Sequence, residues 1–303
     1  MIIRNDNIQE ANLLNLVGGS GIDTNASAYL SAVISAGGMV DSISIEAVDT
    51  LFKSLKSASL YNKIIIMYPF VGGVGAAHSI NALNPGTNDM FFRNKVSAPW
   101  VHTTTGSYNT EVDGTRQDGN WATVGSQYNG ALAGQGVANP TGKSPGAIFV
   151  SAADMSASVY SRGKLGRGTG GSQPAIFGPS EGSTNRFQFV LRWSSQDTSY
   201  CLFPNGGNGY EFTDTNSTGY YVISRTSTSS GGVYKNGSVV LAFTGEPTTC
   251  DLDNDSPLYI NCGATTETIE YSFIHFGTGL NGTESTALTN IVQTFQTSLG
   301  RQV

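Results

Sequence analysis

The sequence predicts a mainly β protein: a β-sandwich preceded by a short pair of helices and closed by a C-terminal helix. Two patterns support this fold class. Many short apolar or alternating runs are separated by Gly, Asn, Ser and Pro, which is typical of antiparallel strands in a sandwich. Apolar residues at helical spacing are found near the two ends of the 303-residue chain.

The first 60 residues are predicted to form two helices. In the first, the N-cap is Asp23 or Thr24, a Gly pair ends the helix, and the apolar stripe consists of Tyr29, Leu30, Val33 and Ile34. In the second, Ser44 is the predicted N-cap, and the stripe consists of Ile45, Val48, Leu51, Phe52 and Leu55. Because each helix has one apolar stripe, both must dock on another part of the protein.

From residue 64 onward the pattern changes to strands. Ile64–Tyr68 is apolar throughout and is closed by Pro69, which predicts a strand buried on both faces. Further predicted strands are residues 147–150, 187–193, 220–223 and 269–276. Residues 101–146 and 161–186 are rich in Gly, Thr, Ser and Asn. These segments could form long surface loops or irregular strands, and the sequence does not decide between the two.

One hairpin is nearly explicit in the sequence. Asn236-Gly237 separates two strand-like runs within residues 233–240. This dipeptide tolerates the two positive φ angles of a type I′ turn, so we expect a two-residue hairpin here.

The chain is predicted to end in a helix. Thr283 is its predicted N-cap, Glu284 lies in its first turn, and Gly300 ends it. Its apolar stripe consists of Leu288, Ile291, Val292, Phe295 and Leu299. We expect this stripe to pack against the sandwich.

Composition narrows the classes of function. Gly accounts for 38 residues and charged residues for only 13%, which predicts a neutral, turn-rich surface. The net charge of -6 comes without any basic block, so nucleic-acid binding has no electrostatic basis. No apolar run approaches the length of a membrane helix, and we expect no membrane insertion. The first 19 residues lack the basic and apolar regions of a secretory signal.

The three cysteines do not form a disulfide framework or a zinc motif. They are Cys201, Cys250 and Cys262, an odd number at wide spacing. Two alternatives remain open: Cys250 pairs with Cys262 across a hairpin, or all three are buried thiols. The second is favoured because unpaired cysteines are commonly core residues.

Three Gly-rich segments have a superficial likeness to catalytic or phosphate-binding motifs. Residues 178–182 (GPSEG) match a nucleophile elbow, but a strand is predicted after them where the motif needs a helix. Residues 136–144 are similar to a phosphate loop, with five rather than four residues between the glycines and Pro145 directly afterwards. Residues 166–171 lack the βαβ setting of a dinucleotide site. Each is interpreted as a turn or loop.

Two groups of carboxylates are candidates for functional sites. Glu211 and Asp214 are candidates for an acid/base pair of a glycan-degrading enzyme, which needs two carboxyl groups flanking one bond. Asp251, Asp253 and Asp255 could bind calcium as a loop, but the EF-hand pattern fails because Ser256 stands in place of the required Gly and Cys262 in place of the required Glu. We therefore predict no catalytic residue, no metal site and no cofactor, and a protein that is not an enzyme.

The histidines show no metal-ligand spacing. His78, His102 and His275 lie far apart in the sequence. His275 is predicted to lie on the same strand face as Tyr271 and Phe273, which favours a hydrogen-bonded histidine in the core or at its rim.

Aromatic side chains offer a route to sugar binding. Trp100, Trp121 and the 13 tyrosines could stack on sugar rings, or they could serve as core and edge packing in a sandwich. The sequence does not assign a binding residue.

Two stretches resemble a known family. The first covers residues 61–107 and contains YNKIIIMYPFVGGVGAAHSINALNPGTNDMFF and SAPWVHTTTGS, and the second is SFIHFGTGLNGTESTALTNIVQTFQTSLGR at residues 272–301. Both resemble phage and prophage virion proteins with a concanavalin A-like (laminin G-like) domain. The resemblance covers roughly residues 23–303, although the middle is similar only in composition. It implies a jelly-roll β-sandwich with a short N-terminal helical pair and a closing C-terminal helix, and it supplies no catalytic residue.

The resemblance implies a structural protein of a bacteriophage virion, such as a fibre, spike or decoration component, made in the host cytoplasm. Residues 1–60 would form a helical segment that anchors the protein in the virion, and residues 61–303 the sandwich with its closing helix. The implied partners are other virion proteins, further copies in a homo-oligomer (a trimer suits a fibre) and host-surface glycans. Two alternatives remain open: a carbohydrate-binding, lectin-like module, and a glycan-degrading enzyme on the same sandwich.

Overall fold

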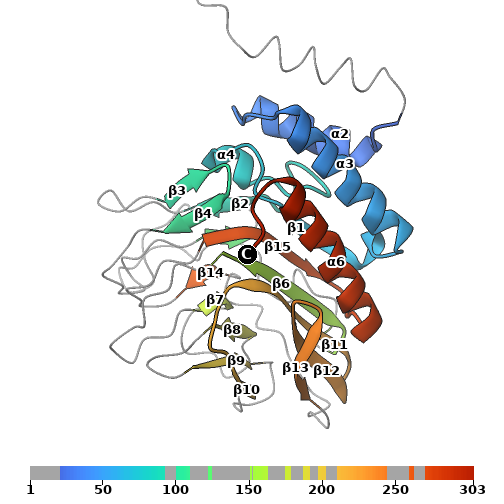
Figure 1. Ribbon diagram of the computed structural model, residues 1–303, viewed down its shortest axis with the longest axis vertical. Helices are drawn as coiled ribbons and strands as arrows, with labels where there is room; N and C mark the ends of the chain where they lie inside the picture. Colours follow the sequence, from blue (N-terminus) through green and yellow to red (C-terminus); the bar gives the residue numbers. More distant parts are fainter. Residues whose placement is uncertain are drawn as a thin grey trace, which may run out of the picture.

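The computed structural model describes residues 21–92, 100–109, 122–124, 151, 153–162, 175–178, 187–191, 197–202, 210–243, 259–262 and 270–303. Figure 1 shows three layers: a group of helices, a first sheet (sheet A) and a second sheet (sheet B). All the strand pairs described in both sheets are antiparallel. This confirms the predicted mainly β sandwich with an N-terminal helical pair and a C-terminal helix.

Within the described residues, sheet A has eight strands: β13-β12-β11-β6-β15-β4-β3 in this order, with β1 also paired to β15. They are β1 (Ile64–Tyr68), β3 (Trp100–Thr103), β4 (Gly106–Asn109), β6 (Met155–Ser161), β11 (Gly219–Ser227), β12 (Ser230–Lys235), β13 (Ser238–Phe243) and β15 (Glu270–Gly277). Strands β6 and β15 are buried along their whole length, and β1 nearly so. The prediction that β1 is buried on both faces is confirmed.

In the part of the chain that the structure describes, sheet B has seven strands in the order β10-β9-β8-β7-β14-β5-β2. They are β2 (Met90–Phe92), β5 (Ala122–Val124), β7 (Ala175–Gly178), β8 (Gln188–Val190), β9 (Thr198–Leu202), β10 (Tyr210–Thr213) and β14 (Tyr259–Cys262). The inner core lies between the two sheets, and its members include Tyr68, Phe187, Phe189, Leu191 and Phe276. The predicted strand at residues 147–150 lies outside the described residues.

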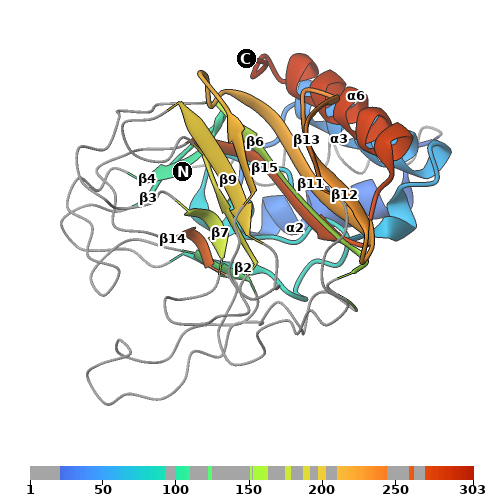
Figure 2. The same ribbon diagram turned by 90° about the horizontal axis from the view of Figure 1, so that it is seen from below.

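The helical layer covers the outer face of sheet A (Figure 2). It contains α2 (Thr24–Ser35), α3 (Ser42–Ser57), α4 (Gly75–His78), α6 (Gly282–Ser298) and the short 3₁₀ helix η1 (Tyr61–Lys63). Within the described ranges, no helix is both long and apolar enough to cross a membrane.

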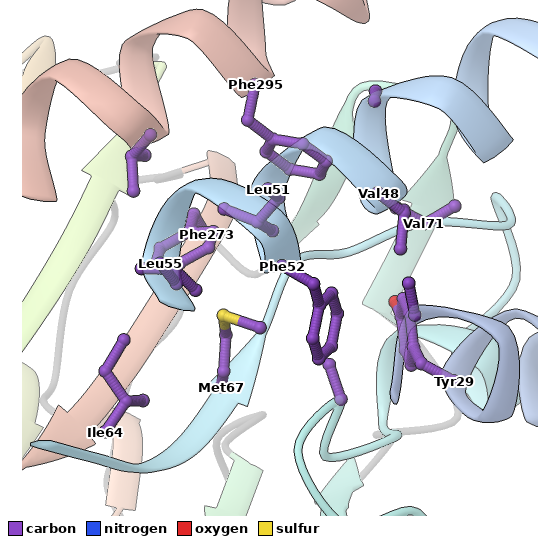
Figure 3. Close-up of a cluster of buried hydrophobic side chains, with 14 of the residues drawn as sticks. Tyr29, Val48, Leu51, Phe52, Leu55, Ile64, Met67, Val71, Phe273 and Phe295 are labelled. Carbon is purple, nitrogen blue, oxygen red and sulfur yellow. The ribbon is translucent and has the colours of Figure 1, made fainter. Parts of the chain in front are cut away.

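A second core lies between the helices and sheet A. Figure 3 shows Phe52 of α3, Met67 of β1 and Phe273 of β15 within this cluster, together with Phe295 of α6. Because apolar cores lie on both sides of sheet A, its central strands β6 and β15 have no solvent-exposed face, and the wholly apolar run Ile64–Tyr68 is the sequence pattern of such a buried strand. The helices and the sandwich thus pack against each other through this second core, and the division of the chain at residue 60 stays a prediction.

Helix capping differs in part from the prediction. Asp41 rather than Ser44 caps α3, and its Oδ1 accepts a hydrogen bond from the Ser44 amide at 2.8 Å. Asn281 rather than Thr283 caps α6, in a capping box with Glu284. An N-cap needs an extended backbone and a side-chain oxygen that reaches the N–H three residues on, and Asp41 (ψ 176°) and Asn281 (ψ 175°) meet both conditions. For α2 the sequence left Asp23 and Thr24 as alternative caps, and the structure shows that Asp23 is the cap.

The predicted hairpin is confirmed. Asn236 and Gly237 have φ angles of 49° and 82°, as a type I′ turn requires. The tip docks on α6, where Thr286 Oγ1 donates to the carbonyl of Gly237 at 3.1 Å and Gln293 Nε2 donates to Asn236 Oδ1 at 3.3 Å. These contacts fix the hairpin at one edge of sheet A.

Candidate functional site

Asp214 lies directly after β10 and is the buried partner of an ion pair. Its Oδ1 accepts from Lys235 Nζ at 2.7 Å, and its Oδ2 accepts from Ser199 Oγ at 2.8 Å and from the Tyr221 hydroxyl at 2.9 Å. The Asp214 side chain is 1% exposed. Since Ser199 belongs to sheet B while Tyr221 and Lys235 belong to sheet A, this carboxylate joins the two sheets.

Glu211 does not share this environment. Burial alternates along β10, with Glu211 and Thr213 exposed and Phe212 buried in the inner core. Glu211 therefore faces solvent on the outer side of sheet B, whereas the Asp214 carboxylate is enclosed by its three partners. An exposed carboxylate and an enclosed one on opposite sides do not flank one substrate bond, so this geometry gives the acid/base interpretation no support.

His275 lies in β15 and is fully buried beneath the helical layer. Its Nε2 lies 3.1 Å from Ser156 Oγ, and its Nδ1 contacts the hydroxyls of Ser158 and, at 3.4 Å, Tyr220. Burial lowers the pKa of this imidazole to about 3, so it is neutral at pH 7. The predicted hydrogen-bonded core histidine is confirmed.

The predicted face of Tyr271 is wrong. The pairing of β15 with β6 shifts between Tyr271 and Phe273, which marks a bulge. Tyr271 therefore belongs to the inner core and Phe273 to the core under the helices. One additional residue in a strand turns the following side chains to the opposite face, which strict alternation does not anticipate.

The structure brings His78 and His102 to one serine. His78 Nδ1 lies 2.7 Å and His102 Nδ1 lies 2.8 Å from Ser107 Oγ. Sequence reasoning missed this cluster. It joins the end of α4, strand β3 and strand β4, which only the tertiary fold places together.

The hydrogen-bond partners fix the proton positions in this cluster. The amide of Gly73 donates to His78 Nε2 at 3.1 Å, so that nitrogen carries no hydrogen. Neutral His78 therefore carries its hydrogen on Nδ1 and donates it to Ser107. Ser107 Oγ, which accepts from His78, also forms a hydrogen bond with His102 Nδ1 at 2.8 Å. The result is a hydrogen-bonded chain from Gly73 through His78 and Ser107 to His102.

The surroundings keep both histidines neutral. Ser107 has no exposed surface, the Phe70 ring centroid lies 5.5 Å from that of His78, and the Phe92 centroid lies 4.8 Å from that of His102. Burial lowers the pKa of His102 to about 4, and burial, His102 and Arg301 together lower the pKa of His78 well below its usual value. The chain is therefore an enclosed network that holds neutral imidazoles, and its serine hydroxyl is shielded from any substrate in solution.

The remaining sequence candidates are only partly described. Within the described part of the chain, no three His, Cys, Asp or Glu side chains gather to hold a metal ion. Cys201 is buried in the inner core, Trp100 lies in β3 and Cys262 in β14. Outside the described residues lie Trp121, Trp193, Cys250, Asp251, Asp253, Asp255, Ser180 and the segments 136–144 and 166–171.

No protein-family model matches this chain, and a search of curated proteins finds no match. Among solved structures, a receptor-binding domain shares 10% identity and superposes with a TM-score of 0.54, over 80% of this chain and 53% of the other. The binding domain of botulinum neurotoxin DC in complex with rat synaptotagmin II shares 9% identity, with a TM-score of 0.51 over 77% of this chain and 52% of the other.

A third similar structure is of botulinum neurotoxin type C, a toxin that depends on interaction with two ganglioside molecules to enter cells. It shares 8% identity, with a TM-score of 0.50 over 78% of this chain and 53% of the other. The chain thus spans about half the length of the solved structures that it matches. At this level of identity the likeness shows the fold: the two-sheet sandwich found in binding domains of this kind.

Proposed function

We propose that this chain is a glycan-binding module of the lectin type. The observation that carries the proposal is the two-sheet sandwich, which superposes on a receptor-binding domain over 80% of the chain with a TM-score of 0.54. A similar sandwich belongs to a toxin that depends on gangliosides, which are glycolipids. A common fold does not fix a common ligand, so the chemistry of the surface must supply the rest of the argument.

The layers limit where a glycan could bind. Helices cover the outer face of sheet A except at its edge strand β13, and the inner face of sheet A is packed against sheet B. A ligand would therefore meet sheet B or the segments that connect the strands, where Glu211 and Thr213 of β10 are exposed. Binding residues are commonly held on the loops of a rigid scaffold, and the neutral composition of this chain suits hydrogen bonding to uncharged sugar hydroxyls.

A glycan array probed with the full chain tests this function. We expect binding to a restricted set of glycans and a loss of about fivefold in Trp121→Ala, because stacking of an aromatic ring on a sugar contributes on the order of 1 kcal/mol. Lys53→Ala on the exposed side of α3 is the control and should bind as the parent does. Failure to bind any glycan, or equal binding by all three proteins, would contradict the proposal.

A second proposal is that the module is part of a phage virion. The two stretches that resemble virion proteins form one structural unit: β1 pairs with β15, and Arg301 after α6 donates hydrogen bonds to the carbonyls of Pro69 and Phe70. The resemblance therefore rests on segments that fold together, which supports a common architecture. Other virion subunits and further copies of the chain would be its partners.

Gold-labelled antibody against this chain, applied to particles purified from the producing strain, tests the virion location. Regular labelling of intact particles supports the virion location, and labelling only of free protein would contradict it.

An assay for new reducing ends, on any glycan that binds in the array, distinguishes binding from turnover. Release of sugars would favour the glycan-degrading alternative over a purely lectin-like module.

A further inference from the structure

The tip of the hairpin between β12 and β13 carries a chemically labile dipeptide. It consists of Asn236 and Gly237, and an Asn-Gly pair is prone to deamidation because glycine has no side chain that shields its nitrogen. The Gly nitrogen attacks the side-chain amide carbon of Asn, and a five-membered imide forms. The Gly N–H proton passes through solvent to the leaving amine, which departs as ammonia, and water then opens the imide to Asp or isoaspartate. Asn236 is exposed, so burial does not keep water from this tip.

The backbone of the turn opposes ring closure. The five-membered ring requires the Gly nitrogen and the Asn Cβ to lie on the same side of the bond between the Asn Cα and carbonyl carbon. The φ angles of 49° at Asn236 and 82° at Gly237 are those of a type I′ turn. In such a turn ψ of the first central residue is about 30°, which directs the Gly nitrogen nearly opposite the Asn Cβ. The reaction therefore requires the turn to open.

Contacts with β11 and α6 hold the turn closed. The amide of Asn236 donates to the carbonyl of Tyr220 at 2.8 Å. Asn236 Oδ1 accepts from the amide of Tyr220 at 2.9 Å and from Gln293 Nε2 at 3.3 Å. Thr286 Oγ1 donates to the carbonyl of Gly237 at 3.1 Å. Two of these bonds come from β11 and two from α6, so the tip must leave both elements before the turn can open.

We propose that Asn236 is a conformationally protected deamidation site, which reacts in molecules whose hairpin tip has left β11 and α6. The rate then equals that of an unstructured Asn-Gly pair multiplied by the fraction of molecules with the tip released. Deamidation also makes the release permanent, because isoaspartate adds a methylene group to the main chain and the two-residue turn cannot re-form with it. This inference goes beyond the proposed glycan binding and does not depend on it.

Peptide mass spectrometry of the full chain, incubated in mildly alkaline buffer, tests the proposal. The measured quantity is the rate at which Asp and isoaspartate accumulate at residue 236, and the same chain unfolded in urea is the reference. We expect the native chain to react at least about a hundredfold more slowly, because each of the four hydrogen bonds lowers the released fraction about fivefold. A native chain that reacts as fast as the unfolded chain, or faster, would overturn the proposal.

A matched pair of variants at Thr286 links the rate to the contact with α6. Thr286→Val keeps the shape of the side chain and removes the hydroxyl that donates to Gly237, so Asn236 should deamidate about fivefold faster than in the parent. Thr286→Ser retains the hydroxyl, and its rate should stay within about twofold of the parent rate. Equal rates in the two variants would mean that this contact does not hold the turn, which contradicts the proposal.

A second Asn-Gly pair serves as an internal control. Within the described ranges it is Asn281-Gly282, where Asn281 caps α6 and accepts from the amide of Glu284 at 3.0 Å. Gln293→Ala, about three turns further along α6, removes one donor to Asn236 and should accelerate deamidation there about fivefold. The rate at Asn281 should stay within about twofold. No acceleration at Asn236, or equal acceleration at both sites, would rule out a local release of the hairpin tip.

Discussion

The guanidinium of Arg301 donates from Nη1 to the carbonyl oxygen of Phe70, at 2.9 Å, across 231 residues of sequence. Its Nη2 donates to the carbonyl of Pro69 at 3.1 Å, and its Cζ lies 5.3 Å from the ring centroid of Phe295. Phe70 is buried and has a φ of 52°, a conformation that costs a residue with a side chain about 1 kcal/mol or more. One buried cation thus holds the turn after β1 against the end of α6.

Replacing Arg301 should therefore weaken the whole fold. Arg301→Met keeps most of the volume but leaves two buried carbonyl oxygens without a donor, so we expect a loss of about 2–4 kcal/mol in the free energy of unfolding by urea. Arg301→Lys retains the charge but not the planar fork, and its loss should be roughly half as large. Equal stability of Arg301→Met and the parent protein would show that the guanidinium does not hold this turn.

Acid should destabilise the protein well above the pH at which its carboxylates titrate. Burial holds the pKa of His102 near 4 and that of His275 near 3, and the pKa of His78 is also lowered, whereas each is about 6.5 in an unfolded chain. Between pH 6.5 and these lowered pKa values, the unfolded state binds more protons than the folded state does. The free energy of unfolding therefore falls as pH falls. Each histidine contributes about 1.4 kcal/mol per pH unit below pH 6.

Urea unfolding of the parent and of His102→Gln at pH 7, 6 and 5 measures this effect. Gln does not titrate in this range, so the decline in the variant should be shallower than in the parent by about 1.4 kcal/mol per pH unit. A parent protein whose unfolding free energy stays constant from pH 6.5 to pH 5 would mean that the three imidazoles are protonated in the fold.

Local sequence patterns predicted most of the elements because those patterns report on burial. The apolar stripe of α6 and the Asn236-Gly237 turn were both recognisable within a few residues. The N-caps were predicted less well: Ser44 and Thr283 are suitable residue types, but only the backbone geometry at Asp41 and Asn281 decides which residue caps.

The polar clusters could not be predicted because they are made by tertiary contacts. Ser107 meets His78 from 29 residues away, and no spacing rule covers a serine shared by two histidines. Asp214 was recognised as a candidate, but its enclosure by Lys235 depends on the meeting of two sheets. The bulge beside Tyr271 likewise could not be predicted from the alternation of apolar residues in β15.

Asp214 and Glu211 should differ sharply as stabilising residues. Asp214→Asn leaves the Lys235 ammonium without a carboxylate in a largely buried setting, and we expect a loss of about 2–4 kcal/mol in unfolding free energy. Glu211→Gln changes an exposed side chain and should remain within about 0.5 kcal/mol of the parent. Similar losses for both variants would contradict the separate environments of the two carboxylates.

Alanine variants at Gly72 and Gly86 separate the free-energy cost of steric crowding from that of backbone strain. Gly72 and Gly86 both have positive φ angles, of 104° and 84°. A Cβ at Gly72 would lie 2.8 Å from Val33 Cγ1 and 3.1 Å from the Cα of Gly38, whereas a Cβ at Gly86 would meet nothing within 4 Å. Gly86→Ala should therefore cost only the strain of about 1–2 kcal/mol.

Gly72→Ala should cost the same strain and an additional 1–3 kcal/mol or so, because the new methyl group pushes α2 away from the turn after β1. Urea unfolding of the two variants under identical conditions gives this difference directly. If the two losses agree within error, the backbones at Gly38 and Gly72 can move apart without a cost in free energy. The helical layer would then be held to the sandwich by its apolar contacts and by Arg301, and not by the close approach of these two glycines.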